Sequence, residues 1–273
     1  PSKFIESVFS TFTYDGNGST QSITNGMDLA NKGGLVWFKD RAGTSSHRLF
    51  DTERGATKSL RSNATSASVT EADTLTSFNA DGFSLGADSQ SMGTNVSGTA
   101  TVSWTFRKQP KFFDIASYTG DGSGSDITIS HNLGCEIGFA LIKRNQDGHD
   151  WYAMHRESGS SLDSKFGYLN NTNAFASGSI ITASSSSSVT FSNGNGFNTS
   201  GKKYVVYLFA HNDDDGGFGS TGDQDMIKCG SYTGNGSATG PEIDLGFEPQ
   251  WIMIKSASGA HPWFIIDVMR GFS

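Results

Sequence analysis

Short apolar runs separated by glycine-rich polar segments recur along the entire chain. Residues alternate between apolar and polar in Ile127–Ser130 and Ser188–Phe191, which is the two-residue period of a strand with one buried face. Continuous apolar runs of strand length occupy Leu35–Phe38, Val205–Phe209 and Trp251–Ile254. Runs of that kind are typical of strands buried on both faces. The pattern therefore predicts an all-β protein.

The segments between these runs carry the residues of tight turns. Gly-Asn-Gly, Asp-Gly and Asn-Gly steps supply the positive φ angles that hairpins require. Only two short stretches, Asp51–Arg61 and Ser66–Asp73, have a pattern compatible with a helix. Helices are thus expected to contribute little to the fold.

Three sets of markers repeat in the same order at intervals of roughly 105 to 115 residues. In each copy a tyrosine opens a glycine-rich turn, and an apolar run that ends in lysine comes next. A short strand then follows, which ends in Asp in the first and third copies and in His in the second. The turns are Tyr14–Gly18, Tyr118–Gly122 and Tyr232–Gly236; the apolar runs are Leu35–Lys39, Phe139–Lys143 and Trp251–Lys255; the strand ends are Asp51, His155 and Asp267. The first two copies also share a tail, Val102–Phe106 and Val205–Phe209.

These markers predict tandem, lectin-like β-sandwich repeats of about 105 residues, each with roughly seven or eight strands. We expect one repeat in residues 1–111, a second in 112–222 and a partial third in 223–273. A β-propeller is the rival architecture, but its blades repeat at about half this period. Half a sandwich would leave strand edges open. We therefore expect either a longer natural chain or a partner that completes the third copy.

Composition narrows the class of protein further. The chain has 273 residues, 34 of them glycine, with 12% aromatic and 17% charged residues and a formal net charge of −7. This acidic balance, without a basic cluster longer than two residues, argues against nucleic acid as a ligand. No apolar run is long enough to span a membrane as a helix. The two cysteines, Cys135 and Cys229, form neither a disulfide framework nor a zinc motif.

Motifs of catalysis are missing from the sequence. It contains no nucleophile elbow, no His-Glu-x-x-His and no phosphate-binding loop with lysine. Two carboxylate pairs, Asp51 with Glu53 and Asp147 with Asp150, are the candidates for glycosidase groups, but the repeats do not retain them. We predict a protein that is not an enzyme and that uses no cofactor.

Two groups of residues remain as binding candidates. Asp213, Asp214 and Asp215 are weak calcium candidates, because their spacing does not follow the alternation of a calcium loop and favours a solvated linker. Trp151 and Trp263 each follow a polar loop, which makes them better candidates for stacking on sugar rings than the tryptophans inside apolar strands. With Trp151 we group His149 and Tyr152 as a candidate glycan-binding set, joined by Trp263.

Several longer strings, taken together, are specific enough to suggest a family. They are Gly16–Leu29, Gly33–Lys39, Leu49–Lys58, Leu75–Gly86 and Tyr204–Asn212. They resemble a repeat family of marine bacteriophages, found in cyanophage tail-fibre-like and other virion structural proteins. The resemblance implies a β-rich virion component with lectin-like binding, and it supplies no catalytic residues.

From the resemblance we expect a virion structural protein, in a tail or fibre and exposed on the particle surface. Its leading expected role is host attachment as an adhesin that binds cell-surface glycans, with other virion proteins as partners. A homo-oligomer, with a trimer favoured, is expected because phage fibres are commonly trimeric. The alternatives are a purely architectural head or tail decoration protein and a glycan depolymerase. Neither nucleic acid binding nor membrane insertion is expected.

Overall fold

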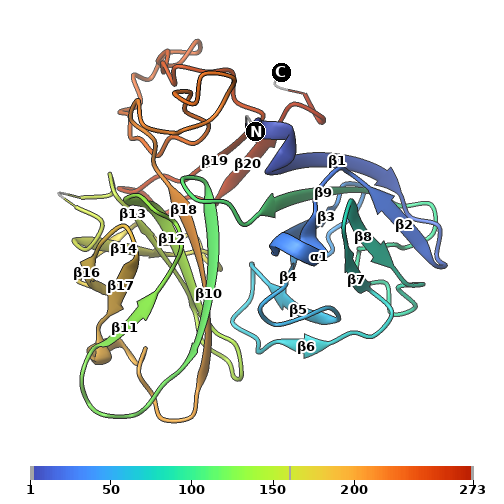
Figure 1. The fold of residues 1–273 in the computed structure, drawn as a ribbon, viewed down its shortest axis with the longest axis horizontal. Helices are drawn as coiled ribbons and strands as arrows, with labels where there is room; N and C mark the ends of the chain where they lie inside the picture. Colours follow the sequence, from blue (N-terminus) through green and yellow to red (C-terminus); the bar gives the residue numbers. More distant parts are fainter. Residues whose placement is uncertain (1–2, 160, 272–273) are drawn as a thin grey trace.

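A computed structural model describes residues 3–159 and 161–271, and it is nearly all β, with 39% of residues in strands and 4% in helices. The predicted all-β sandwich fold is confirmed. Three lobes surround a common centre (Figure 1), and we call them the first lobe (residues 3–111), the second lobe (112–159 and 161–222) and the third lobe (223–271). No helix in the described residues is long and apolar enough to cross a membrane.

The first lobe packs a six-stranded antiparallel sheet against a three-stranded one. The large sheet has the order β1-β9-β3-β4-β5-β6 and the small sheet the order β2-β8-β7. The strands are β1 (Phe9–Asp15), β2 (Gln21–Thr24), β3 (Gly34–Asp40), β4 (Arg48–Asp51), β5 (Lys58–Arg61), β6 (Val69–Thr70), β7 (Leu75–Asn79), β8 (Gly82–Leu85) and β9 (Ala100–Arg107).

The second lobe has the same topology. Its large sheet has the order β10-β18-β12-β13-β14-β15 and its small sheet the order β11-β17-β16. The strands are β10 (Phe113–Thr119), β11 (Ile127–Ser130), β12 (Ile137–Arg144), β13 (Trp151–His155), β14 (Lys165–Tyr168), β15 (Ala176–Ser177), β16 (Ile181–Ser184), β17 (Ser188–Phe191) and β18 (Lys203–Ala210). Strand for strand, the order matches that of the first lobe.

The third lobe contains one hairpin, β19 (Trp251–Ile254) and β20 (Phe264–Asp267). Trp251 pairs with Asp267, as Leu35 pairs with Asp51 in the first lobe. The hairpin therefore corresponds to β3–β4 and to β12–β13. Short helices complete the described fold: η1 (Ile5–Ser7), α1 (Leu29–Lys32) and η2 (Asn193–Asn195).

Two expectations about local structure were wrong. Asp51–Arg61 and Ser66–Asp73 form turns and strands instead of helices. Positive φ angles at Thr57 and Gly55, 66° and 91°, break any helix there. Each full sandwich also has nine strands in the described residues, which is more than the seven or eight expected. The additional strands include the edge strands β6 and β15, which are only two residues long and leave little signal in the sequence.

The continuous apolar run of β3 is buried on both faces, as its pattern predicts. Val36 and Phe38 face the small sheet of their own lobe, where they pack with Ile23 and Phe83. Leu35 and Trp37 point to the opposite face and enter the core at the centre of the molecule. This alternation follows from the two-residue period of a strand. The large sheets are thus the middle layers of the protein.

The central core joins all three lobes. The inner faces of the two large sheets pack against each other, and half-buried residues of the third lobe, including Trp251, Met253 and Ile265, pack on them. The rings of Phe106 and Phe209 meet at 5.4 Å, and Phe106 lies equally close to Trp251. Burial of this aromatic surface is what holds the lobes together.

The hydrogen bonds that tryptophan side chains donate between lobes run in one cyclic direction. From second to first lobe, Trp151 Nε1 donates to the carbonyl oxygen of Arg61 at 2.9 Å; from third to second, Trp263 Nε1 donates to that of Tyr168 at 2.9 Å. These donors occupy corresponding positions, as do the acceptors at the ends of β5 and β14.

A second pair of bonds follows the same cycle. Tyr207 of the second lobe donates its hydroxyl to Asp51 of the first at 2.7 Å, and Trp104 of the first donates Nε1 to Asp267 of the third at 3.0 Å. Tyr207 and Trp104 hold the same position in β18 and β9. The lobes are therefore arranged with approximate threefold symmetry.

A buried asparagine closes the first turn of each full lobe. Asn95 accepts a hydrogen bond from the backbone of Asn17 and donates to the carbonyl of Gly86 at 2.7 Å. Asn198 accepts from the backbone of Asp121 at 2.8 Å in the same way. Neither asparagine stands out in the sequence, although each is followed two positions later by Ser and both lie in matching tails.

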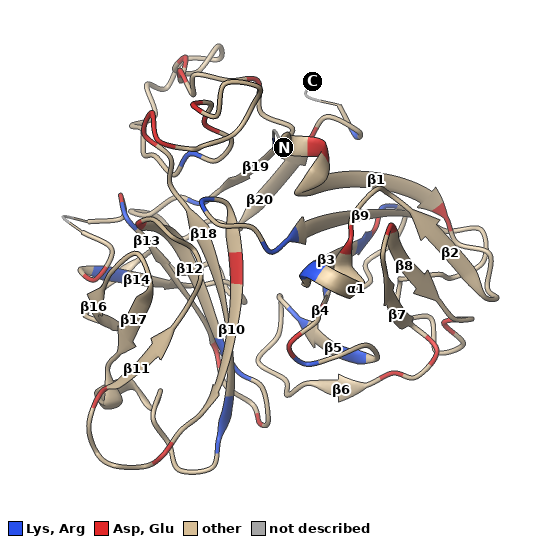
Figure 2. Cartoon of the chain, viewed as in Figure 1, with Lys and Arg blue, Asp and Glu red and all other residues tan. Residues whose placement is uncertain are grey.

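Charge is unevenly distributed over the lobes. Residues 211–250 contain eight acidic residues and one lysine, which gives this segment a formal charge of −7, the same as that of the whole chain. Figure 2 shows these acidic groups in the loops that precede β19. The remaining chain is formally neutral, so the excess negative charge of the protein lies in this segment.

Candidate functional site

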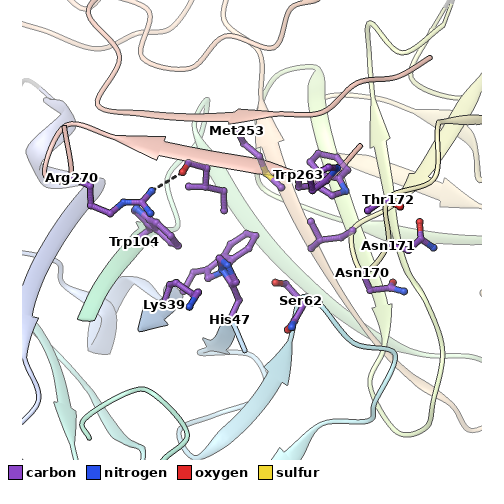
Figure 3. A pocket seen from close by; sticks show the side chains of 15 residues that line it. Lys39, His47, Ser62, Trp104, Asn170, Asn171, Thr172, Met253, Trp263 and Arg270 are labelled. Carbon is purple, nitrogen blue, oxygen red and sulfur yellow. Dashed lines mark hydrogen bonds between the residues drawn. The ribbon is translucent and has the colours of Figure 1, made fainter. Parts of the chain in front are cut away.

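A pocket of about 320 Å³ lies where the three lobes meet (Figure 3). Every lobe contributes to its lining. The lining residues are Trp37, Lys39, His47, Ser62, Asn63, Trp104, Leu169, Asn170, Asn171, Thr172, Met253, Pro262, Trp263, Ile265 and Arg270. Because these residues come from segments more than 200 positions apart, the pocket exists only in the folded chain.

Lys39 is placed in the pocket by a local device that all three lobes share. Its Nζ donates to the carbonyl oxygens of Asp40 and Gly43, at 2.5 and 3.0 Å, and so closes the turn after β3. Lys143 and Lys255 bond the carbonyls one and four residues ahead in the same manner. The lysine that ends each apolar run is therefore a turn clamp, and Lys39 is the one that also lines the pocket.

An aromatic wall forms on the first-lobe side of the pocket. The His47 ring stacks on Trp104 with their centroids 6.1 Å apart, and Trp37 donates Nε1 to His47 Nδ1 at 2.9 Å. Because Nδ1 accepts this bond, the neutral ring carries its proton on Nε2. Burial, reinforced by the positive charges of Lys39 and Arg270, lowers the pKa of His47 to about 4. His47 is therefore uncharged at neutral pH.

Arg270 supplies a cation on the third-lobe side. Its guanidinium carbon lies 5.0 Å from the centre of the Trp104 ring, within cation–π range. Its Nε bonds Asp267 at 2.5 Å, and a further nitrogen donates to the carbonyl oxygen of Ile265 at 2.7 Å. These contacts fix the side chain over the tryptophan while leaving it partly exposed at 26%.

Amide side chains form the second-lobe side. Asn170 accepts from the backbone N–H of Trp151 at 2.7 Å and donates to Asp150 at 2.7 Å, which holds it rigidly. Asn171 follows it, with its side-chain oxygen accepting from the backbone of Asn173 at 2.9 Å. These residues are absent from the predicted site, because nothing in their local sequence pattern indicates that they meet Trp104 and Arg270.

The arrangement suits binding of a polar ligand. Two cations, aromatic rings and amides face one cavity, and the described residues that line it include no Asp or Glu. Glycoside hydrolysis in most families requires two carboxyl groups on opposite sides of the substrate. The described residues of this lining offer none, so the pocket does not fit that reaction.

The structure separates the residues predicted to bind glycans. Trp151 is completely buried, since it packs on Tyr207 and bonds Arg61 of the neighbouring lobe. The prediction that Trp151 is exposed for stacking on sugar rings is therefore wrong, because a ring that follows a loop can still face a neighbouring lobe. Tyr152 and His149 lie half-buried beside each other at 5.8 Å. Trp263 alone of the four lines the pocket.

Burial also affects the titration of that pair. It lowers the pKa of His149 and, together with Tyr168, raises the pKa of Tyr152 to about 12. Both are uncharged at neutral pH. A glycan-binding role for Trp151, Tyr152 and His149 stays a prediction.

The acidic loop lacks the geometry of a calcium site. Asp215 pairs with Lys111 at 3.6 Å, and Asp213 lies 3.9 Å from Lys228. Asp225 accepts from the backbone of Asp214 at 2.9 Å. Within the described ranges, no three His, Cys, Asp or Glu side chains converge as a metal site would require. The weak calcium candidates therefore gain no support.

Acidification is expected to destabilise the protein through two histidines. Burial lowers the pKa of His47 and of His155 to about 4, from an ordinary value of 6.5. The unfolded chain thus binds protons at a higher pH than the folded chain, so the contribution to stability is complete above pH 6.5 and is lost as the pH falls toward 4. We expect each histidine to account for about 1 to 3 kcal/mol of this loss.

Urea unfolding at pH 7.0 and at pH 4.5 measures this effect. Between pH 7.0 and pH 4.5 the double variant His47→Gln/His155→Gln should lose clearly less stability than the wild type. Protonation of carboxylates lowers the stability of the two proteins equally, so the difference between them reports on the histidines. Equal losses in the two proteins would contradict the assignment.

Comparisons with known proteins identify a family and no activity. One family model, described as a domain of unknown function (DUF7483), matches residues 1–273. No curated protein and no solved structure matches the chain. Because the model spans the full sequence, the chain belongs to the DUF7483 family, a domain of unknown function.

Proposed function

We propose that this chain is a structural component of a bacteriophage particle, in a tail or fibre, that contributes to host attachment by binding cell-surface glycans. The observation that carries the glycan-binding part is the pocket shared by the three lobes. Its combination of a half-buried tryptophan, fixed amides and two cations matches the groups that proteins use for sugars. The resemblance of the longer sequence strings to virion proteins supports the location on the particle.

The charges around the pocket favour an acidic glycan. Lys39 and Arg270 face the cavity, while His47 is neutral there. Two carboxylates beside the lining already have partners: Asp267 is fully buried and bonded to Arg270 and Trp104, and Asp150 accepts from Asn170. A sugar carboxylate, as in a uronic acid, would therefore meet two cations and no competing anion.

Attachment of this kind works through many weak contacts. A pocket of about 320 Å³ lies at the lower end of the size range of ligand sites, which implies modest affinity for each site. Several copies on one particle raise the effective concentration and convert weak binding into stable attachment. We accordingly propose a homo-oligomer, with a trimer favoured, that assembles with other virion proteins.

Replacement of Lys39 by Gln tests the site with a matched control. Lys39→Gln should weaken binding of an oligogalacturonate, a uronic acid polymer, by roughly tenfold, because one charge-assisted hydrogen bond is lost. Lys143→Gln removes the corresponding turn clamp in the second lobe, outside the pocket, and should leave binding unchanged. Isothermal titration calorimetry at 50 and 200 mM salt provides the measurement.

Equal weakening in both lysine variants would show that fold stability, and not the pocket, controls binding. Absence of binding to acidic and neutral glycans on a bacterial-surface array would favour the second candidate, a purely architectural head or tail protein. The burial of Trp151 against a neighbouring lobe is the observation that favours that candidate, because such contacts build rigid arrays.

A further inference from the structure

A second and larger cavity, of about 670 Å³, lies between the first and second lobes. It shares no described lining residue with the pocket of the three lobes, and its lining comes from segments within residues 53–70 and 117–204. We call this cavity the interlobe groove. We propose that the interlobe groove binds a phosphate ester of a sugar or polyol. This site is separate from the proposed glycan pocket and does not depend on it.

The second-lobe wall of the groove continues the face of β10 that forms the central core. Phe113 and Ile115 are buried in that core, and side chains two residues apart share one face of a strand. Ser117 and Thr119 therefore point toward the first lobe (Figure 1), and both are exposed in the groove. Lys203 pairs with Thr119 in the sheet, so its side chain lies on the same face. This wall offers two hydroxyl groups and an ammonium group.

The first-lobe wall supplies a second ammonium group. Lys58 opens β5 and pairs with Thr70 of the edge strand β6, and its Nζ donates to Thr70 Oγ1 at 2.5 Å. An ammonium group carries three donors, so two remain for a ligand. Ser68 lines the same wall and accepts from Arg54 Nη1 at 3.2 Å, which leaves its own proton to donate. Two lysines thus enter the groove from opposite lobes.

The carboxylates around the groove already have cationic partners. Glu53, the one acid in the described lining, lies 3.0 Å from Lys108. Asp147, in the turn after β12, bonds Arg144 at 2.5 Å and Lys202 at 2.9 Å. Among the residues that the structure describes, neither lysine of the groove belongs to an ion pair. Their two positive charges are therefore available to an anionic ligand.

Hydrogen bonds across and within the walls hold the groove in shape. Ser68 of the first lobe donates its N–H to the carbonyl oxygen of Asn145 in the second at 2.8 Å. Gln146 Oε1 accepts from the backbone N–H of Lys203 at 3.1 Å, so the NH₂ group of this amide is the part left to donate to a ligand. A groove that is already formed loses less conformational freedom when it binds.

The lining is rich in donors, which favours a ligand rich in acceptors. A phosphate ester presents three acceptor oxygens in a tetrahedral arrangement, so it can accept from both walls at once. Its charge of about −1.5 to −2 near pH 7 matches the two unpaired lysines. A planar carboxylate is instead suited to the fork of an arginine, and Arg54 of this groove already bonds Asp51.

Hydrogen bonding, and not stacking, is the means by which the groove would hold the sugar or polyol. Tyr118 and Tyr204 line it, but their rings stack on each other with centroids 4.6 Å apart. Their hydroxyls donate to the carbonyl oxygens of Phe197 and Gly196 inside the second lobe. The exposed hydroxyl and amide groups of the walls are the partners that remain for the hydroxyls of the ligand.

Glucose 6-phosphate is the probe for this groove, added to the full chain and followed by ¹H–¹⁵N NMR. We expect saturable shifts at the backbone amides of Thr119, Gln146 and Lys203, with a dissociation constant in the millimolar range. Lys58→Gln and Lys203→Gln should each weaken binding by roughly tenfold, because each removes one charge-assisted hydrogen bond. Unchanged spectra outside the groove show that the variants remain folded.

Lys165→Gln is the matched control. Lys165 opens β14 and pairs with Ser177 as Lys58 pairs with Thr70, but it does not line the groove. This variant should bind glucose 6-phosphate as the wild type does. Lys39→Gln, which alters the pocket of the three lobes, should also leave this binding unchanged.

Inorganic phosphate and glucose separate the ester from its parts, and each should bind clearly more weakly than glucose 6-phosphate. Equal binding of inorganic phosphate would overturn recognition of the sugar, and equal binding of glucose would overturn the role of the lysines. Absence of saturable shifts, shifts confined to other surfaces or equal weakening by Lys165→Gln would overturn the site itself. The readout involves neither oligogalacturonate nor Lys39, so failure here is distinguishable from failure of the proposed glycan site.

Discussion

Arg54→Met is expected to destabilise the protein by about 3 to 5 kcal/mol, one of the largest effects of any single substitution in the chain. The side chain of Asp51 is completely buried, and Arg54 bonds it through Nε at 2.5 Å. Tyr207 of the second lobe donates to the same carboxylate. Methionine fills most of the space of the arginine, so the loss reflects a buried charge without its partner and not a cavity.

A double variant distinguishes charge from packing. Asp51→Asn/Arg54→Met removes both charges and keeps an oxygen that accepts from Tyr207. It should recover at least about half of the stability lost by Arg54→Met alone, because the neutral pair no longer carries the desolvation cost of an isolated carboxylate. Denaturant unfolding of the four proteins in this cycle gives the coupling energy.

The control is an ion pair of the same length in a more exposed place. Arg144 bonds Asp147 at 2.5 Å, also three residues apart, with side-chain exposures of 18% and 31%. Arg144→Met should cost only about 0 to 1 kcal/mol. Similar losses for the two arginines would refute the argument that burial sets the cost.

Trp104→Ala should destabilise the protein by about 3 to 5 kcal/mol and loosen the third lobe. Trp104 is fully buried, lies 6.2 Å from Trp37 in an edge-on contact and bonds Asp267 across the lobe interface. Truncation creates a cavity in the central core and removes the surface on which Arg270 rests. Hydrogen exchange should therefore accelerate in β19 and β20 more than elsewhere.

Trp104→Phe and Trp37→Phe separate the two contributions. Both keep a ring, but only the first removes a bond between lobes, because Trp37 Nε1 bonds His47 within its own lobe. Faster exchange of β19 and β20 is expected for Trp104→Phe and not for Trp37→Phe. If both variants change this hairpin equally, the link from Trp104 to Asp267 has no special role.

The local pattern of the chain predicted the strands well. Continuous apolar runs such as Leu35–Phe38 became strands buried on both faces, since a side chain on either face met an apolar neighbour. The run Trp251–Ile254 has the same pattern and is only half-buried. An apolar strand pattern thus shows which side chains can be buried, and the segments that pack against the strand decide how far they are buried.

The prediction of helix in Asp51–Arg61 failed for a physical reason that is visible only in three dimensions. Asp51 and Arg54 are three residues apart, a spacing that also suits a helical face. In the structure the same two residues cap a turn, and their side chains bond groups of β4, β5 and the second lobe. The tertiary contacts outweigh the weak local preference.

By itself, the sequence determined the all-β class, the turns, the repeated order of strands and the lysine that ends each apolar run, because these depend on neighbours close along the chain. The tertiary structure alone decided that Trp151 is buried, that Trp263 lines a pocket and that Lys39, Asn170 and Arg270 face one cavity. These features depend on how three lobes pack around a shared core, and packing between distant segments leaves no periodic signal in any one of them.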